Sequence, residues 1–213
     1  GFKALGDYKD APDRVFKVEY EAGMQLLNSG DYEAASERFK SLGDYEDAAE
    51  KAAEAEYHIA DELMKSEQFE DAITRFTNIQ DYEDASDRIN ECKYIMVTNA
   101  MEAEQYGDAV DLLADLGDYK DATDLLNNAT YQLAMLSYNN RDYEEAQSLF
   151  ESLGDYEDAA DLAETCIFRQ TVDGQFLQAF ADGLSARWDD DDVSDDPDNI
   201  EFVSYRRRLI GYE

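Results

Sequence analysis

The sequence predicts an all-α fold, an α-solenoid of stacked antiparallel helical hairpins with a C-terminal capping helix. The main observation is a seven-residue segment, 5–11, that recurs every 37 residues without insertion or deletion. Between its copies, apolar residues follow each other at steps of three and four, which is typical of helices packed on one face. Only two prolines and 11 glycines occur in 213 residues, and this scarcity also favours long helices.

Four further columns stay in phase with this 37-residue period. One is aromatic, one is alanine, one is large and apolar, and the last is aromatic in all five copies. Their members are Tyr32, Phe69, Tyr106 and Tyr143; Ala35, Ala72, Ala109 and Ala146; Phe39, Phe76, Leu113 and Phe150; and Tyr20, Tyr57, Tyr94, Tyr131 and Phe168.

Each repeat is expected to contain a long helix and a short one. The short helix carries Tyr143, Ala146, Phe150 and Leu153, whose spacing places all four on one face. The long helix, of roughly 20 residues, is expected to begin at the Asp-Tyr pair of the recurring segment. A turn near Gly30 and its equivalents joins it to a short helix of roughly 11 residues.

Two aspartate columns accompany the start of each long helix. The first is predicted to cap the helix, because a carboxylate there accepts backbone amides that have no partner within the helix. The second lies three residues later, where the helix dipole favours negative charge. The predicted caps are Asp44, Asp81, Asp118 and Asp155, and the second column is Asp47, Asp84, Asp121 and Asp158.

The repeats define the expected domain organisation. An isolated hairpin cannot bury both of its apolar faces, whereas hairpins stacked in a row can. Residues 1–170 are therefore predicted to hold five in-phase copies, the first of them truncated. Because the chain starts in the middle of a repeat, we expect an excised fragment in which Gly1 is a cloning remnant.

The short helices resemble the second helix of the tetratricopeptide repeat (TPR), through Tyr32, Ala35, Phe39 and Leu42 and their equivalents. The small residues of that family's first helix are matched by Gly23, Ala60, Val97 and Ala134. This unit is 37 residues long instead of 34, and Glu19, Glu56, Lys93 and Thr130 stand near the family's tryptophan. The resemblance covers residues 2–168 and implies a helical-repeat solenoid that binds another protein, often an extended peptide. It identifies no individual binding residues.

Residues 171–213 are expected to form a cap helix, an acidic loop and a tail. The stripe Phe176, Leu177, Phe180, Leu184 and Trp188 predicts a helix over 174–188 that covers the end of the stack. The run 189–198 is rich in aspartate, and the segment 200–213 fits a helix or a strand. Arginines 206–208 are expected to neutralise acidic surface nearby, or else to bind an anionic partner.

The acidic loop also contains the one candidate metal site. Carboxylates at the spacing of a calcium loop suit a hard cation, although an aspartate occupies the position where such a loop needs glycine. A solvated loop is the simpler interpretation, and we expect no cofactor. The candidate calcium ligands are Asp190, Asp192, Ser194, Asp196, Asp198 and Glu201.

Reactive side chains are few. Cys92 and Cys166 share a small apolar column with Ala55 and Ala129, so both are predicted to be free thiols buried in the core. His58 is the only histidine and is interpreted as an ordinary helix residue. We find no phosphate-binding loop, zinc motif or convincing carboxylate pair for catalysis, and therefore expect a protein that is not an enzyme.

The charge balance favours a protein partner. With 52 acidic and 18 basic residues the formal net charge is −34, which disfavours nucleic acids and anionic membranes and favours a basic partner. No membrane-spanning segment or signal peptide is seen, and the compartment is left open. The predicted function is protein–protein interaction or scaffolding through the solenoid surface. The alternatives are a passive spacer between an anchor and another domain and, more weakly, an enzyme domain seeded by residues 171–213.

Overall fold

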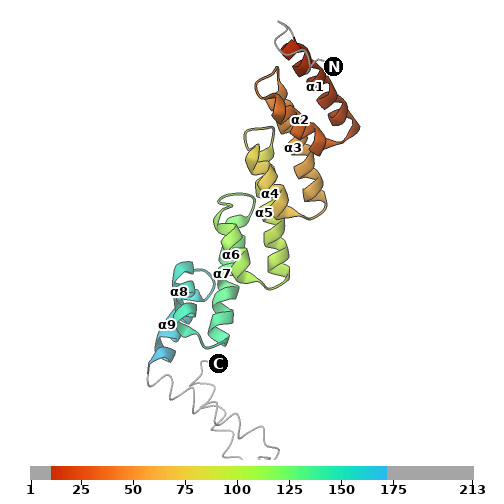
Figure 1. Ribbon diagram of the computed structural model, residues 1–213. Coiled ribbons are helices and arrows are strands. Elements are labelled where there is room, and N and C mark those ends of the chain that lie inside the picture. Colours follow the sequence, from red (N-terminus) through yellow and green to blue (C-terminus); the bar gives the residue numbers. More distant parts are fainter. Residues whose placement is uncertain (1–10, 172–213) are drawn as a thin grey trace, which may run out of the picture. The chain divides into compact units, whose positions relative to one another are not determined.

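The computed structural model describes residues 11–171, and this part of the chain forms nine helices and no strand (Figure 1). The predicted all-α, solenoid-like fold is confirmed. The chain divides into two compact units, residues 1–122 and 123–213. The helices are α1 (Ala11–Ser29), α2 (Tyr32–Leu42), α3 (Ala48–Lys65), α4 (Phe69–Asn78), α5 (Ala85–Glu102), α6 (Tyr106–Ala114), α7 (Ala122–Asn139), α8 (Tyr143–Leu153) and α9 (Ala159–Gln170).

In the first unit, long helices alternate with short ones, and every helix from α1 to α6 packs against the next one along the chain (Figure 1). The long helices α3 and α5 therefore each contact two short helices, one from their own hairpin and one from the hairpin before. In the second unit, α8 packs against α9, and a buried core joins residues of α7, α8 and α9. This neighbour-to-neighbour packing is how each hairpin buries the apolar face that it cannot cover alone.

The alanine and large apolar columns form the core. Ala35, Ala72, Ala109 and Ala146 are fully buried, and so are the phenylalanines of the large apolar column. Phe76 and Phe150 share a buried cluster with a small residue of the long helix, Ala60 and Ala134 respectively. A Cβ at Gly23 would lie 2.9 Å from the Phe39 ring. Where the long helix carries the bulkier Val97, the short helix carries Leu113 in place of phenylalanine.

The long helices begin three residues later than predicted. Their first residues are buried alanines, so the N-cap position falls on Asp47, Asp84 and Asp158 instead of the aspartates three residues before. The interpretation of Asp44, Asp81, Asp118 and Asp155 as N-caps is therefore wrong. The residues now at the cap, moreover, make no side-chain hydrogen bond to their own helix.

The carboxylates of this second aspartate column instead accept a hydrogen bond from the tyrosine column of the preceding long helix. Each pair is separated by 27 residues, and the phenol donates over 2.5–2.7 Å. The loop tyrosine of the recurring segment packs against the same ring, with centroids 5.9–6.1 Å apart. Two columns of the repeat are thus explained by one contact between consecutive long helices. The pairs are Tyr20–Asp47, Tyr57–Asp84, Tyr94–Asp121 and Tyr131–Asp158.

These tyrosine–aspartate bonds predict a loss of stability at high pH. The hydrogen bond to Asp158, together with burial, raises the pKa of Tyr131 to about 12, against a usual value of about 10 in an unfolded chain. The folded state therefore holds this proton more tightly, and the stabilisation is complete below about pH 10 and lost as the pH rises towards 12.

We expect Tyr131→Phe to lower the free energy of unfolding by about 1 kcal/mol at pH 9, because one hydrogen bond is lost. The difference from the parent chain should shrink by pH 11, where the parent begins to lose the same bond. Denaturant titrations of both chains at the two pH values measure this difference in the free energy of unfolding. An equal difference at the two pH values would show that the hydroxyl proton of Tyr131 does not contribute to stability.

The turns from long to short helices contain a residue in the left-handed region. This position is Gly30 in the first hairpin, with φ 82°, but Glu67, Glu104 and Arg141 in the later ones, with φ between 58° and 68°. A side chain is strained in this conformation, whereas glycine is not. The later turns therefore carry a strain that the first one avoids.

Glu104→Gly is accordingly expected to raise the free energy of unfolding by about 1 kcal/mol. The control is Glu102→Gly, two residues away at the end of α5, which should be destabilising because that residue is helical. Chemical denaturation compares the two variants. The same sign of change in both would contradict an origin in the backbone conformation.

Candidate functional site

The structure tests some of the residues to which the sequence drew attention. The calcium candidates Asp190, Asp192, Ser194, Asp196, Asp198 and Glu201, the cap helix 174–188 and the arginines 206–208 lie outside the described residues. Within residues 11–171, no group of three or more His, Cys, Asp or Glu side chains is placed to hold a metal ion. No helix in this range combines the length and apolar character required to cross a bilayer.

Both cysteines are free thiols with fully buried side chains, as predicted. Burial raises the pKa of Cys92 to about 11 and raises that of Cys166 as well, so neither thiol is a ready nucleophile. His58 is half-buried and stacks on Tyr32 with ring centroids 4.5 Å apart. This packing is consistent with the structural role that the sequence predicts for it.

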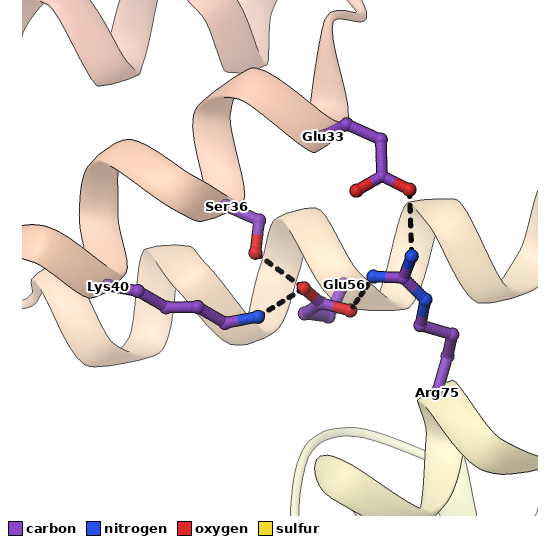
Figure 2. Close-up of polar contacts among 5 residues, drawn as sticks. All are labelled: Glu33, Ser36, Lys40, Glu56 and Arg75. Carbon is purple, nitrogen blue, oxygen red and sulfur yellow. Dashed lines mark hydrogen bonds and ion pairs between the residues drawn. The ribbon is translucent and has the colours of Figure 1, made fainter.

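A polar network that the sequence did not predict surrounds Glu56, which is only 3% exposed. Its carboxylate accepts hydrogen bonds from the Ser36 hydroxyl at 2.5 Å, the Lys40 ammonium at 2.5 Å and the Arg75 guanidinium at 2.8 Å. Arg75 donates a further bond to Glu33 at 2.9 Å. Figure 2 shows that the network joins α2, which carries Glu33, Ser36 and Lys40, to α3 and α4.

The network keeps a buried carboxylate ionised. Burial by itself would raise the pKa of Glu56, but the hydrogen bonds from Lys40, Ser36 and Arg75 outweigh it and lower that pKa to about 2. Lys40 reaches inward from the surface, with 58% of its side chain exposed. Because all three donors are engaged by one carboxylate, the cluster is better suited to joining three helices than to proton transfer.

A groove of about 640 Å³ lies beside this network, on the side of α3 that faces the short helices. Ala49, Ala52 and Ala53 of α3 line it, together with Phe39 and Glu56. On either side of these residues, the carboxyl ends of α2 and α4 and the loops after them supply Lys40, Gly43, Asp44, Thr77, Asn78, Ile79, Gln80, Asp81 and Tyr82. Its volume falls within the range of about 300–1,000 Å³ that is common for pockets that bind small ligands.

Comparison of the repeats shows how the floor of the groove differs one repeat later. There Ala52 is replaced by Ile89, Ala53 by Asn90 and Glu56 by Lys93. Larger side chains thus stand at two positions where α3 presents alanine, so the alanine floor is not shared by these two repeats.

The ion pair that joins the long and the short helix of a hairpin also changes from one repeat to the next. Arg38 pairs with Glu19 as Arg75 pairs with Glu56, each across 19 residues. In the third hairpin the acidic position holds Lys93, which pairs with Asp115 at 3.0 Å. The buried carboxylate with three donors is thus specific to the second hairpin among those described.

A second cavity, of about 500 Å³, lies on the second unit and is lined by Asp142, Glu144, Glu145, Ser148 and Leu149. Three of these five residues carry carboxylates, so its lining is acidic. It lacks the alanine floor of the groove beside α3.

Comparison of the chain with protein-family models and with curated protein sequences found no match. The site is therefore interpreted from its geometry. The sequence did not predict this site because no motif marks it. Its only signal in the sequence is that Glu56 is replaced by Lys93 one repeat later.

Proposed function

We propose that this chain is a TPR-like, non-enzymatic protein-interaction module that binds a basic segment of another protein. The supporting observation is the way its charges are distributed. In the first unit, eight lysines and arginines each pair with a carboxylate of the same unit: Arg38, Lys40, Lys51, Lys65, Arg75, Arg88, Lys93 and Lys120. The remaining carboxylates are therefore left to face solvent in excess, and such a surface attracts cationic partners.

The apolar surface supports recognition by charge. Among the described residues, the exposed large hydrophobic side chains are Phe16, Val18, Leu136, Ile167 and Phe168, which lie on α1, α7 and α9. Helices α2 to α6 contribute none of them. Binding to this region would rely on carboxylates and shallow apolar contacts, because a row of exposed aromatic anchors is missing from it.

The same observation favours a second candidate, a passive spacer between an anchor and another domain. A spacer needs no binding surface and is expected to expose few aromatic side chains, as α2 to α6 do. The two functions differ in one measurable property, which is the affinity of the chain for a basic peptide.

Fluorescence anisotropy with a labelled twelve-residue peptide of alternating lysine and alanine tests the proposal. We expect saturable binding that weakens by about tenfold or more between about 50 and 300 mM salt, because the Debye length shortens. The matched control is a peptide of alternating glutamate and alanine, which should not bind. Absence of binding at low salt would favour the spacer, and affinity independent of salt would contradict recognition by charge.

A further inference from the structure

We infer that the groove beside α3 is a docking site for an arginine side chain of the basic partner, together with the small residues that flank it. This inference rests on the proposed function, because it names the place and the chemistry of the contact. Three features of the groove support it: its negative potential, its alanine floor and its aromatic wall.

Negative potential converges on the groove from two kinds of source. Asp44 and Asp81 both line it, both are exposed, and neither forms an ion pair with a lysine or arginine of the described residues. The carboxyl ends of α2 and α4 also line it, and the last carbonyl groups of a helix carry partial negative charge. The cation among the lining residues, Lys40, is held by Glu56 at 2.5 Å.

The lining also suits the shape of an arginine. An aliphatic stem can lie along Ala49, Ala53 and Ile79 while the planar head group reaches one of the two aspartates. A guanidinium can form two parallel hydrogen bonds with one carboxylate and can stack on an aromatic ring such as Tyr82, which a lysine ammonium does less well. Small flanking residues would fit because the groove is open above an alanine floor.

The repeat provides an internal comparison for this site. Asp44, Asp81 and Asp118 belong to one column of the recurring segment. Asp44 and Asp81 line the groove, whereas Asp118, one repeat further along the chain, does not. The same aspartate column thus supplies both the test positions and a matched control.

The test measures the affinity of a labelled twelve-residue peptide of alternating arginine and alanine for the full chain. We expect it to bind more tightly than the lysine–alanine peptide. The double variant Asp44→Asn/Asp81→Asn should weaken the arginine peptide at least about tenfold, the loss expected when two charge-assisted contacts are removed. The control Asp108→Asn/Asp118→Asn removes the same net charge elsewhere and should change affinity less than twofold.

A second variant, Ala52→Ile/Ala53→Asn, installs the side chains that the next repeat carries and should abolish the preference for arginine over lysine. Circular dichroism establishes whether each variant is folded, and the aspartate variants decide the question if this one is not. Equal losses in the two aspartate pairs, or equal affinity for the two basic peptides, would overturn the inference while leaving the proposed function intact. Failure of both basic peptides to bind the parent chain would overturn both proposals.

Discussion

Phe76→Ala is expected to lower the free energy of unfolding by about 3–5 kcal/mol, the largest single effect that we predict. Phe76 is fully buried in a cluster with Ala60, Ala72, Ala85 and Cys92. It also packs edge-on against Tyr57, with ring centroids 5.5 Å apart. Truncation would leave a cavity in this cluster, and the loss of buried surface adds to the cost of the cavity.

The matched control for this prediction is Phe16→Ala. The Phe16 residue is 40% exposed, so the same truncation removes less buried surface and should cost about 1 kcal/mol or less. Denaturant unfolding of both variants, followed by circular dichroism, measures the difference. Similar losses in the two variants would show that the large apolar column does not hold the hairpins together.

Glu56→Gln is expected to lower the free energy of unfolding by about 3 kcal/mol at neutral pH. The loss arises because an amide replaces the charge that holds Lys40 and Arg75, and removing one partner of a buried ion pair is costly. Glu33→Gln is the matched control in the same network (Figure 2). Its side chain is 61% exposed, so its loss should not exceed about 1 kcal/mol.

The effect of Glu56→Gln should also depend on pH. The pKa of Glu56 is about 2 in the folded chain and near 4.5 when unperturbed, so the unfolded state binds a proton first as the pH falls. The stabilisation by the carboxylate is therefore complete above about pH 4.5 and is lost as the pH falls towards 2. Urea titrations should show that the parent chain exceeds the variant in free energy of unfolding by less at pH 3 than at pH 6. An equal difference at the two pH values would contradict a lowered pKa of Glu56.

These predictions bear differently on function. The Phe76 substitution tests the core that any role of the chain requires. The Glu56 substitution tests a network that joins α2, α3 and α4 and borders the groove. If Glu56→Gln weakens the arginine peptide as well as the fold, the network would act as a support for the docking site.

The repeat itself could be predicted from the sequence, because burial of one helix face every 37 residues leaves in-phase columns. The alanine column, the phenylalanines and the two buried cysteines all lie in the core as their spacing indicates. Local periodicity is enough for such predictions, since each helix reports its own buried face.

The use of the polar columns was decided by tertiary structure. An aspartate before a helix is normally a cap, but here Asp47 and its equivalents accept a hydrogen bond from a tyrosine hydroxyl of the preceding long helix, and the helices begin later than predicted. That partner lies 27 residues away, and no local pattern reveals which acceptor a hydroxyl will reach.

The candidate site was likewise set by tertiary contacts. Glu56 stands in a column that also holds Glu19, Lys93 and Thr130, and its burial depends on donors from two other helices. The groove is floored by three alanines, two of which are replaced by larger side chains, Ile89 and Asn90, one repeat later. Periodicity determines which face of a helix is buried, whereas cavities and buried charges depend on how the side chains of several helices meet.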